Sequence, residues 1–175
     1  MSAYIFYGGA FDPLTLAHER IIQDLWHPWN RLIIGVTDRD YKPSLILVKD
    51  RMGMVRRFCS SLPAKERPAS FRIVRQQGPT YAFLRSRHPE VDTLAVGTDE
   101  LVALIGRAWA YADRLIYGYK LLSFPRYDAI SSRAVRKLMA GRVSREELLQ
   151  YVDESVYGWL KANGYIAIDT TKEKT

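Results

Sequence analysis

Cysteine is almost absent from this sequence: Cys59 is the single thiol among 175 residues. One cysteine excludes an internal disulfide framework and a cysteine-rich zinc site, and it fits a reducing compartment. The three histidines, His18, His27 and His88, lack the spacing of metal ligands. No apolar run approaches the roughly 20 residues of a membrane span, and the short apolar start has no basic leader before Asp12-Pro13. We therefore expect a cytoplasmic protein with no metal site built from its own side chains.

Several nucleotide-binding and nucleic-acid-binding signatures are also missing. The sequence has neither the G-x-G-x-x-G fingerprint nor the Walker A pattern, and it has no RNP or zinc-finger pattern. It does carry a net charge of +7, with basic residues in scattered groups such as Arg51, Arg56 and Arg57, or Arg85 and Arg87. Because no long basic tail occurs, we expect this charge to attract phosphorylated small molecules rather than a specific nucleic acid or a membrane.

Strand and helix signals alternate along the chain, and the composition, 47% hydrophobic and 26% charged, is typical of a soluble globular protein. We expect one domain over residues 1–168 and a polar, disordered tail over residues 169–175. The β-α-β order predicts an α/β fold: a Rossmann-like, doubly wound, mostly parallel sheet with helices on both faces. The predicted strands are 3–7, 31–37, 71–74, 93–97 and, after a turn, 119–124; the predicted helices are 17–26, 49–61, 80–87, 100–105, 132–140, 146–151 and 154–162.

A glycine turn, Gly8-Gly9, lies between the first predicted strand and the first predicted helix. Glycine lets the backbone approach an anion closely, and the free N–H groups of a helix start point at it. Thr15 and His18 lie about one helical turn apart at this helix start. Thr15 is either a hydrogen-bond donor at the site or simply a helix cap, and His18 is either a phosphate ligand or a polar surface residue. Because ligands bind beyond the carboxyl ends of parallel strands, this turn lies where we expect a site.

A second polar helix start follows late in the chain, at Ile130-Ser131-Ser132. Either serine is a natural N-cap. Arg133 and Arg136 follow in the first turn or so, where the helix already has partial positive charge and cations are disfavoured. Their placement indicates a bound anion with several charges, such as a triphosphate. The alternative is an ordinary capped helix with arginines that face solvent.

Two further segments fall at predicted strand ends. Asp99, in the turn Gly97-Thr98-Asp99, can accept hydrogen bonds from ribose hydroxyls, or it can serve as a helix cap. Lys42, in the loop after the second strand, can close over phosphates, or it can be an ordinary solvated lysine. The carboxyl-end rule places both segments along the same edge as the glycine turn.

The first motif resembles the signature of the nucleotidyltransferase superfamily, G-(G/T/S)-x-F-D-P followed by (T/H)-x-G-H. Thr15 stands where many members have a first histidine, and Ala17 stands where glycine is usual. The segment Ile130–Arg136 resembles the later I-S-S-(T/S)-x-(I/V)-R motif, which embraces the ATP phosphates in that family. The ending Tyr151–Ile166 is similar to the family's V-x-x-Y-I-x-x-x-G-L-Y ending.

Within this superfamily, the middle of the chain resembles the nicotinate and nicotinamide mononucleotide adenylyltransferases. Gly97-Thr98-Asp99 is similar to their G-(S/T/A)-D motif, and Trp109 resembles a tryptophan that stacks on the pyridine ring. Thr80-Tyr81 resembles their S-Y-T stretch beside the nicotinyl ring, with threonine for serine and alanine for the final threonine. The resemblance implies an acceptor-binding set, for which we take Thr80, Tyr81, Trp109 and Arg126.

The resemblance implies an enzyme that transfers AMP from ATP to nicotinamide or nicotinic acid mononucleotide, with Mg²⁺ bound through phosphates. His18, Thr15 and Arg136 would be catalytic. The implied ATP-binding residues are Gly8, Gly9, Ala10, Phe11, Lys42, Gly97, Asp99, Ile130, Ser131, Ser132, Arg133 and Arg136.

Two alternatives remain open. The threonine form of the first motif and the Lys42-Pro43 segment are typical of phosphopantetheine adenylyltransferases, which perform the same chemistry on another acceptor. The departures at Thr15 and Ala17 also allow a nucleotide- or RNA-binding relative that has lost turnover. The sequence leaves the oligomeric state open.

Overall fold

A computed structural model of the chain describes residues 3–38, 44–125, 130–141 and 143–167. Five strands form one sheet in the order β3-β2-β1-β4-β5, and every neighbouring pair is parallel. The α/β prediction is therefore confirmed. The central strands are continuous apolar runs because both of their faces are covered. The strands are β1 (Tyr4–Gly9), β2 (Arg31–Asp38), β3 (Ser70–Gln77), β4 (Thr93–Gly97) and β5 (Lys120–Phe124).

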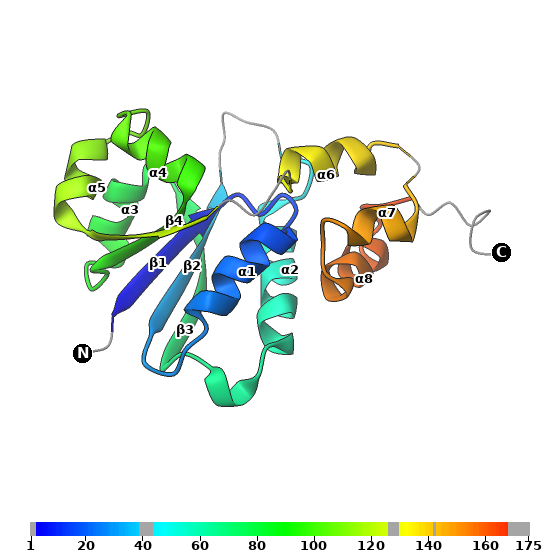
Figure 1. Cartoon of the computed structure of the whole chain (residues 1–175), viewed down its shortest axis with the longest axis horizontal. Helices are drawn as coiled ribbons and strands as arrows, with labels where there is room; N and C mark the ends of the chain where they lie inside the picture. The colour runs from blue at the N-terminus through cyan, green and yellow to red at the C-terminus, as the bar shows by residue number, and fades with distance from the viewer. Residues whose placement is uncertain (1–2, 39–43, 126–129, 142, 168–175) are drawn as a thin grey trace.

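Helices cover both faces of the sheet (Figure 1). Side chains alternate along each strand, so Ile5 and Tyr7 of β1 join the core on one face while Phe6 joins the core on the other. The first core includes residues of α1 (Leu16–Leu25), α2 (Val48–Ser61), α6 (Ser132–Met139), α7 (Arg145–Leu149) and α8 (Glu154–Ala162). The second includes residues of α3 (Thr80–Arg87), α4 (Thr98–Ile105) and α5 (Ala112–Gly118). A short 3₁₀ helix, Ala64–Glu66, precedes β3.

One helix differs from the prediction, which placed only a turn before the last strand. The structure has α5 there, a helix of 7 residues. It contributes Ala112 and Leu115 to the core, and a single i, i+3 pair is too short to establish a helical period in sequence. The other predicted elements exist, with ends shifted by up to three residues, as expected where helix and strand ends depend on tertiary contacts.

Close packing in the sheet requires a glycine on β2. A Cβ built on Gly35 would lie 2.3 Å from Cζ of Phe6, whose ring crosses the neighbouring strand. The Phe6 ring is 2% exposed and belongs to the core beneath α3–α5. Any side chain at position 35 would displace this ring, because a packed interior has no room for it.

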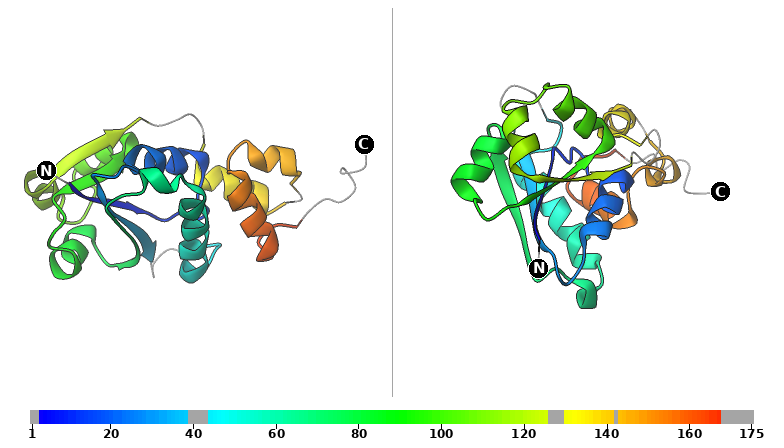
Figure 2. Two further views of the ribbon diagram at one scale, coloured as in Figure 1. Left: turned by 90° about the horizontal axis from the view of Figure 1, so that it is seen from below. Right: turned by 60° about the vertical axis from the view of Figure 1, so that its left-hand side comes forward.

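The helices α6, α7 and α8 lie beyond the carboxyl ends of the strands (Figures 1 and 2). Two of the contacts that hold them to the rest of the fold involve α1 and α2. The Leu16 N–H, at the start of α1, donates to the Tyr151 carbonyl at 2.8 Å. The Trp159 ring of α8 covers Gly53 of α2, where a Cβ would lie 3.5 Å from the ring. These contacts bring the late motif of the chain to the edge where the first motif ends.

Among the described residues, no helix has the length and apolar character needed to cross a membrane. The predicted tail, 169–175, lies outside the described residues.

Candidate active site

A cavity of about 990 Å³ opens at the carboxyl ends of the strands. Its wall combines the loop after β1, the ends of β2, β3 and β4, the segment before α5 and the start of α6. This is the edge at which parallel α/β sheets bind ligands. Of the residues expected at the site, those in the wall are Gly8, Gly9, Ala10, Phe11, His18, Thr80, Gly97, Asp99, Trp109, Ile130, Ser131, Ser132 and Arg136.

His18 is held in one orientation by Thr15. The Thr15 N–H donates to Nδ1 of His18 at 3.2 Å, and the Thr15 hydroxyl lies 2.8 Å from the same nitrogen. Because Nδ1 accepts a hydrogen bond, the proton of the neutral ring is on Nε2. Burial lowers the pKa of His18 to about 4, so the ring is neutral at pH 7. His18 therefore presents an N–H donor, not a cation, to the cavity.

Phe11 has a strained backbone at the centre of the first motif. Its φ angle is +48°, in the left-handed region, and its side chain is fully buried. The ring lies edge-on to His18, with centroids 5.2 Å apart, and it passes so close to Gly9 that a Cβ there would lie 2.8 Å from Cζ. Such strain persists where surrounding packing over-determines the backbone, and it is concentrated at functional sites.

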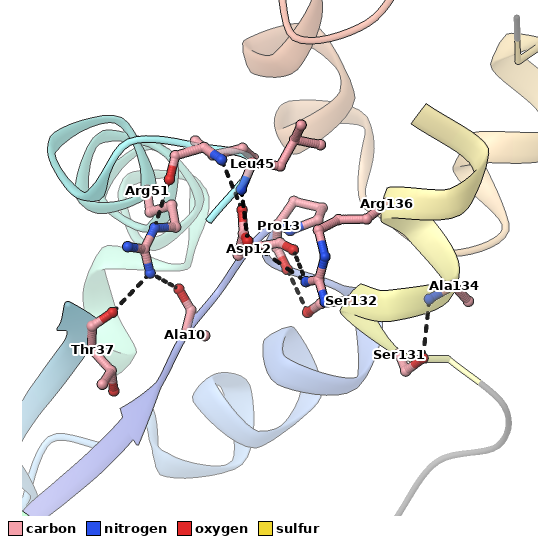
Figure 3. Close-up of polar contacts among 11 residues, drawn as sticks. Ala10, Asp12, Pro13, Thr37, Leu45, Arg51, Ser131, Ser132, Ala134 and Arg136 are labelled. Atoms are coloured by element: carbon pink, nitrogen blue, oxygen red, sulfur yellow. Dashed lines mark hydrogen bonds and ion pairs between the residues drawn. The ribbon is translucent and has the colours of Figure 1, made fainter. Parts of the chain in front are cut away.

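The first motif and the Ile130–Arg136 motif are joined directly by hydrogen bonds (Figure 3). Ser131 caps α6 by accepting a hydrogen bond from the Ala134 N–H, at 3.2 Å. The Ser132 hydroxyl donates to the Pro13 carbonyl at 2.9 Å, and Nη1 of Arg136 donates to the Asp12 carbonyl at 2.6 Å. The two segments thus form one wall around the cavity.

Asp12 is the centre of this junction, and sequence reasoning missed it. Its carboxylate is buried and accepts from the N–H groups of Leu45 and Ile46, at 3.1 and 2.9 Å. The same carboxylate lies 3.6 Å from Nη1 of Arg136. The sequence signal that could have identified Asp12 is its position between two apolar residues, Phe11 and Pro13. A carboxylate that is buried among such residues needs hydrogen-bond or charged partners.

The cavity also has an acidic side at the start of α4. Asp99 and Glu100 lie in the first turn of this helix and line the cavity. Gly97 is the cap residue, so Asp99 does not cap the helix.

Burial and the nearby Glu100 carboxylate raise the pKa of Tyr7, which is 4% exposed in the same wall. Tyr7 is therefore a neutral phenol at physiological pH.

A family model described as cytidylyltransferase-like matches residues 6–171. The chain belongs to the cytidylyltransferase-like family. It is thereby placed in the nucleotidyltransferase superfamily, as its motifs predict.

This cytidylyltransferase-like chain is similar in sequence to curated phosphopantetheine adenylyltransferases. It is 44% identical over 59 residues to a phosphopantetheine adenylyltransferase of Paracoccus denitrificans and 42% identical over 60 residues to one of Rhizorhabdus wittichii. Each match covers 34% of this chain and 36% of the relative, so the chain spans about a third of the length of these relatives.

Its fold is similar over nearly the whole length to a different enzyme. Plasmodium falciparum nicotinic acid mononucleotide adenylyltransferase complexed with NaAD superposes with a TM-score of 0.74 at 18% identity, covering 94% of this chain and 98% of that one. The same enzyme complexed with APC gives 0.72 at 18% identity, with the same coverage.

Some residues expected at the site lie elsewhere in the cytidylyltransferase-like structure. Thr15 is fully buried behind His18, and the side chain of Arg133 is exposed outside the cavity wall. Tyr81 packs against Tyr111, with ring centroids 5.5 Å apart, rather than lining the cavity. Lys42 and Arg126 lie outside the described residues.

Gln76 is a polar residue of the wall that was not among the site residues expected from the sequence. Gln76, at the end of β3, is 3% exposed, and its amide N–H donates to the Thr80 hydroxyl at 3.0 Å. Its amide oxygen accepts from the Thr37 hydroxyl at 3.4 Å. The predicted third strand ends at residue 74, where the apolar run ends, so it does not include Gln76. The three side chains fasten the ends of β2 and β3 to α3.

Proposed function

We propose that the protein transfers the adenylyl group of ATP to the phosphate of nicotinamide or nicotinic acid mononucleotide. An oxygen of the acceptor phosphate attacks the α-phosphorus of ATP in line, the bond from this phosphorus to the bridging oxygen breaks, and pyrophosphate leaves. A phosphate monoester is already a competent nucleophile, so no covalent enzyme intermediate is needed. The protein has to align the two substrates and neutralise developing charge.

A single observation carries the proposal: two motifs far apart in sequence form one cavity wall. Arg136 donates to the carbonyl of Asp12 across 124 positions of the chain, and Ser132 donates to Pro13 beside it. The α6 start, with its free N–H groups, and the glycine turn therefore face the same ligand. This arrangement suits a nucleoside triphosphate, whose phosphates span several ångströms.

The chemical roles follow from the donors. The Nε2–H of His18 would donate to an oxygen on the α-phosphorus, where negative charge increases in the transition state. The Gly8–Phe11 backbone would contact phosphate and ribose, and the α6 start with Arg133 and Arg136 would bind the β- and γ-phosphates, with Lys42 closing over them. Asp99 and Gly97 would contact the ATP side.

Mg²⁺ fits this site through the phosphates. The described residues include no group of three or more His, Cys, Asp or Glu side chains that could hold a metal ion. Hydroxyl, imidazole and guanidinium groups at the wall suit phosphate oxygens instead. When bound to the triphosphate, Mg²⁺ would neutralise charge on the phosphate oxygens while keeping most of its waters.

The acceptor would lie at the Trp109 side of the cavity. Trp109 and Thr80 line it, Tyr81 of α3 packs against the second core, and Arg126 is the remaining member of the proposed acceptor set. The fold likeness to nicotinic acid mononucleotide adenylyltransferase over 94% of this chain supports this assignment.

A second acceptor has its own support. The curated relatives are phosphopantetheine adenylyltransferases, and Thr15 in place of a first histidine is typical of that branch. The transfer chemistry would be the same, with 4′-phosphopantetheine as nucleophile.

The test is pyrophosphate release from ATP and Mg²⁺ with nicotinamide mononucleotide, nicotinic acid mononucleotide or 4′-phosphopantetheine in separate reactions. We expect turnover with a pyridine mononucleotide, identified by its dinucleotide product. Turnover only with phosphopantetheine would establish the second acceptor. ATP binding without turnover on any acceptor would leave a nucleotide-binding protein and would refute the proposed transfer.

A further inference from the structure

Arg51 has an environment unlike that of its basic neighbours in sequence. Arg56 and Arg57 are exposed on α2, whereas Arg51 is 1% exposed and is among the largest fully buried side chains. Burial of a guanidinium is costly unless its N–H groups are bound. Arg51 also lies outside the cavity wall, so the role proposed above for arginines at the phosphates does not apply to it.

The Arg51 guanidinium binds carbonyl groups of three separate segments (Figure 3). Its Nη1 donates to the Ala10 carbonyl at 2.6 Å and to the Thr37 carbonyl at 2.9 Å. Its Nε donates to the Ile46 carbonyl at 2.9 Å. The loop after β1, the end of β2 and the loop before α2 are therefore all hydrogen-bonded to one side chain.

The contact with Ala10 determines which way the next peptide group faces. In a trans peptide the C=O and the following N–H point in opposite directions. The Ala10 carbonyl points at Arg51, which is outside the cavity wall, while Ala10 and Phe11 are both in that wall. Over the described part of the chain, the Phe11 N–H donates to no backbone carbonyl. Its N–H therefore faces the cavity side as an available donor.

We infer that Arg51 is a positioning residue, which holds the Ala10 carbonyl away from the cavity so that the Phe11 N–H binds a phosphate oxygen of the nucleotide. If the peptide turned over, a carbonyl oxygen would face that phosphate and repel it. The inference rests on the proposed function, since it takes a di- or triphosphate as the ligand. The left-handed φ of Phe11, +48°, is the backbone conformation that this arrangement maintains.

Arginine is required because one planar group must serve several acceptors in fixed directions. A lysine at position 51 keeps the charge but has one compact ammonium group, so it cannot bind the Ile46 and Ala10 carbonyls in the same geometry. Arg51→Lys is therefore the informative variant. Val55→Ala is the matched control, because Val55 is a fully buried residue one turn further along α2 with its side chain in the apolar core.

The experiment titrates inorganic pyrophosphate and Mg-ATP into each protein by calorimetry, with thermal melts alongside. We expect Arg51→Lys to weaken binding of both about 10- to 100-fold, the range for one hydrogen bond to a charged group. Val55→Ala should lower the melting temperature with unchanged affinity. If folded Arg51→Lys binds pyrophosphate as the wild type does, the inference is wrong, whatever the wild-type turnover.

A second measurement uses the wild type alone, so it does not depend on a variant that folds. The ¹⁵N–¹H signal of Phe11 should shift on addition of pyrophosphate, and an unmoved signal in the bound protein would overturn the inference. If the wild type binds neither pyrophosphate nor Mg-ATP, the proposed function fails and the inference fails with it. Wild-type turnover with a normal Arg51→Lys variant would refute the inference alone.

Discussion

A neutral histidine fixed by its own helix cap is the central residue of this site. Thr15 engages Nδ1 of His18 with both its N–H and its hydroxyl, and burial keeps the ring unprotonated. The neutral ring donates its N–H to an oxygen on which charge develops and keeps its proton. Because its protonation state does not change near pH 7, its contribution to catalysis does not depend on titration in that range.

Replacement of His18 by alanine should slow adenylyl transfer. Loss of one preorganised donor to an oxyanion typically costs about 10²–10³ in kcat, and we expect at least this loss with a native circular dichroism spectrum. His27→Ala, just beyond the end of α1, is the control and should retain activity. A folded His18→Ala enzyme with full turnover would remove His18 from the mechanism.

The pKa of His18 can be measured directly. Because burial lowers it from 6.5 to about 4, the folded chain binds this proton less tightly than the unfolded chain. Its contribution to stability is thus complete above pH 6.5 and is lost as the pH falls through 4. NMR titration of the ring should give a midpoint near 4, whereas a midpoint near that of free histidine would contradict the enclosed environment described here.

At the level of elements, α6 and α1 each depend on a contact with a distant segment. α6 is held at the cavity by Ser132 and Arg136, which bind the loop before α1. Arg136 therefore has a carboxylate partner in the protein, Asp12, so its position on α6 does not by itself indicate a bound anion; its place in the cavity wall is what supports a role at the phosphates. α1 is held by the turn between α7 and α8, through Leu16.

Arg136→Ala and Arg133→Ala are matched substitutions on α6, because each removes one arginine side chain from the same helix. Arg136→Ala should raise the KM for ATP about 10- to 100-fold and lower the free energy of unfolding by roughly 1–3 kcal/mol, since the buried Asp12 carboxylate loses its cation. Arg133→Ala removes an exposed side chain outside the cavity wall, so its effect on the KM should be smaller and its stability unchanged. Equal effects of the two substitutions on both quantities would contradict these positions.

Glu19 of α1 should make stability depend on pH. Its carboxyl is 3% exposed, and burial together with the negative charge of Asp153 raises its pKa to about 8 from 4.5. The folded chain binds this proton more tightly, so the contribution to stability is complete below pH 4.5 and is lost as the pH rises through 8.

Glu19→Gln removes that titration while keeping the side-chain size. Melting temperatures measured at about pH 5 and about pH 9 should differ less in this variant than in the wild type. Glu66→Gln, on the exposed 3₁₀ helix, should leave the wild-type difference intact. An unchanged pH dependence in Glu19→Gln would show that Glu19 titrates as a solvated carboxyl.

At the level of the whole molecule, the cavity is lined by residues from elements that pack in both hydrophobic cores, one on each face of the sheet. His18 lies on α1, which packs in the first core, and Trp109 packs against the second core beneath α3–α5. The proposed ATP and acceptor sides therefore depend on elements from opposite faces, which meet only at the carboxyl edge of the sheet. A substitution on the acceptor side should therefore change the KM for the acceptor while leaving the KM for ATP nearly unchanged.

Trp109→Ala tests this separation. We expect a large increase in the KM for a pyridine mononucleotide, because an aromatic surface for its ring is lost, with a small change in the KM for ATP. Initial rates with each substrate varied in turn provide both constants. A comparable loss with phosphopantetheine as acceptor, or an increase confined to ATP, would contradict the placement of the acceptor.

The sequence alone determined the layout of the fold and the position of its functional edge. Alternation of apolar strands with amphipathic helices predicts the parallel sheet, and the carboxyl-end rule then gathers Gly8-Gly9, Asp99 and Ser131 on one edge. These are local patterns, so no tertiary information is needed to read them. The short α5 and the end of β3 were missed, because their local patterns are too brief or too polar.

The tertiary structure alone decided which side chains face the cavity and which hold it in place. Arg51, Arg56 and Arg57 are equivalent in sequence, yet of the three only Arg51 is buried, because carbonyl groups of three segments, two of them beyond the loop before α2, converge on its position. In the same way, the Asp12 carboxylate lies beside the Arg136 guanidinium and neutralises it, although the two residues are far apart in sequence. Hydrogen bonds and ion pairs act over a few ångströms in space and not along the sequence, so these partnerships exist only once the chain has folded.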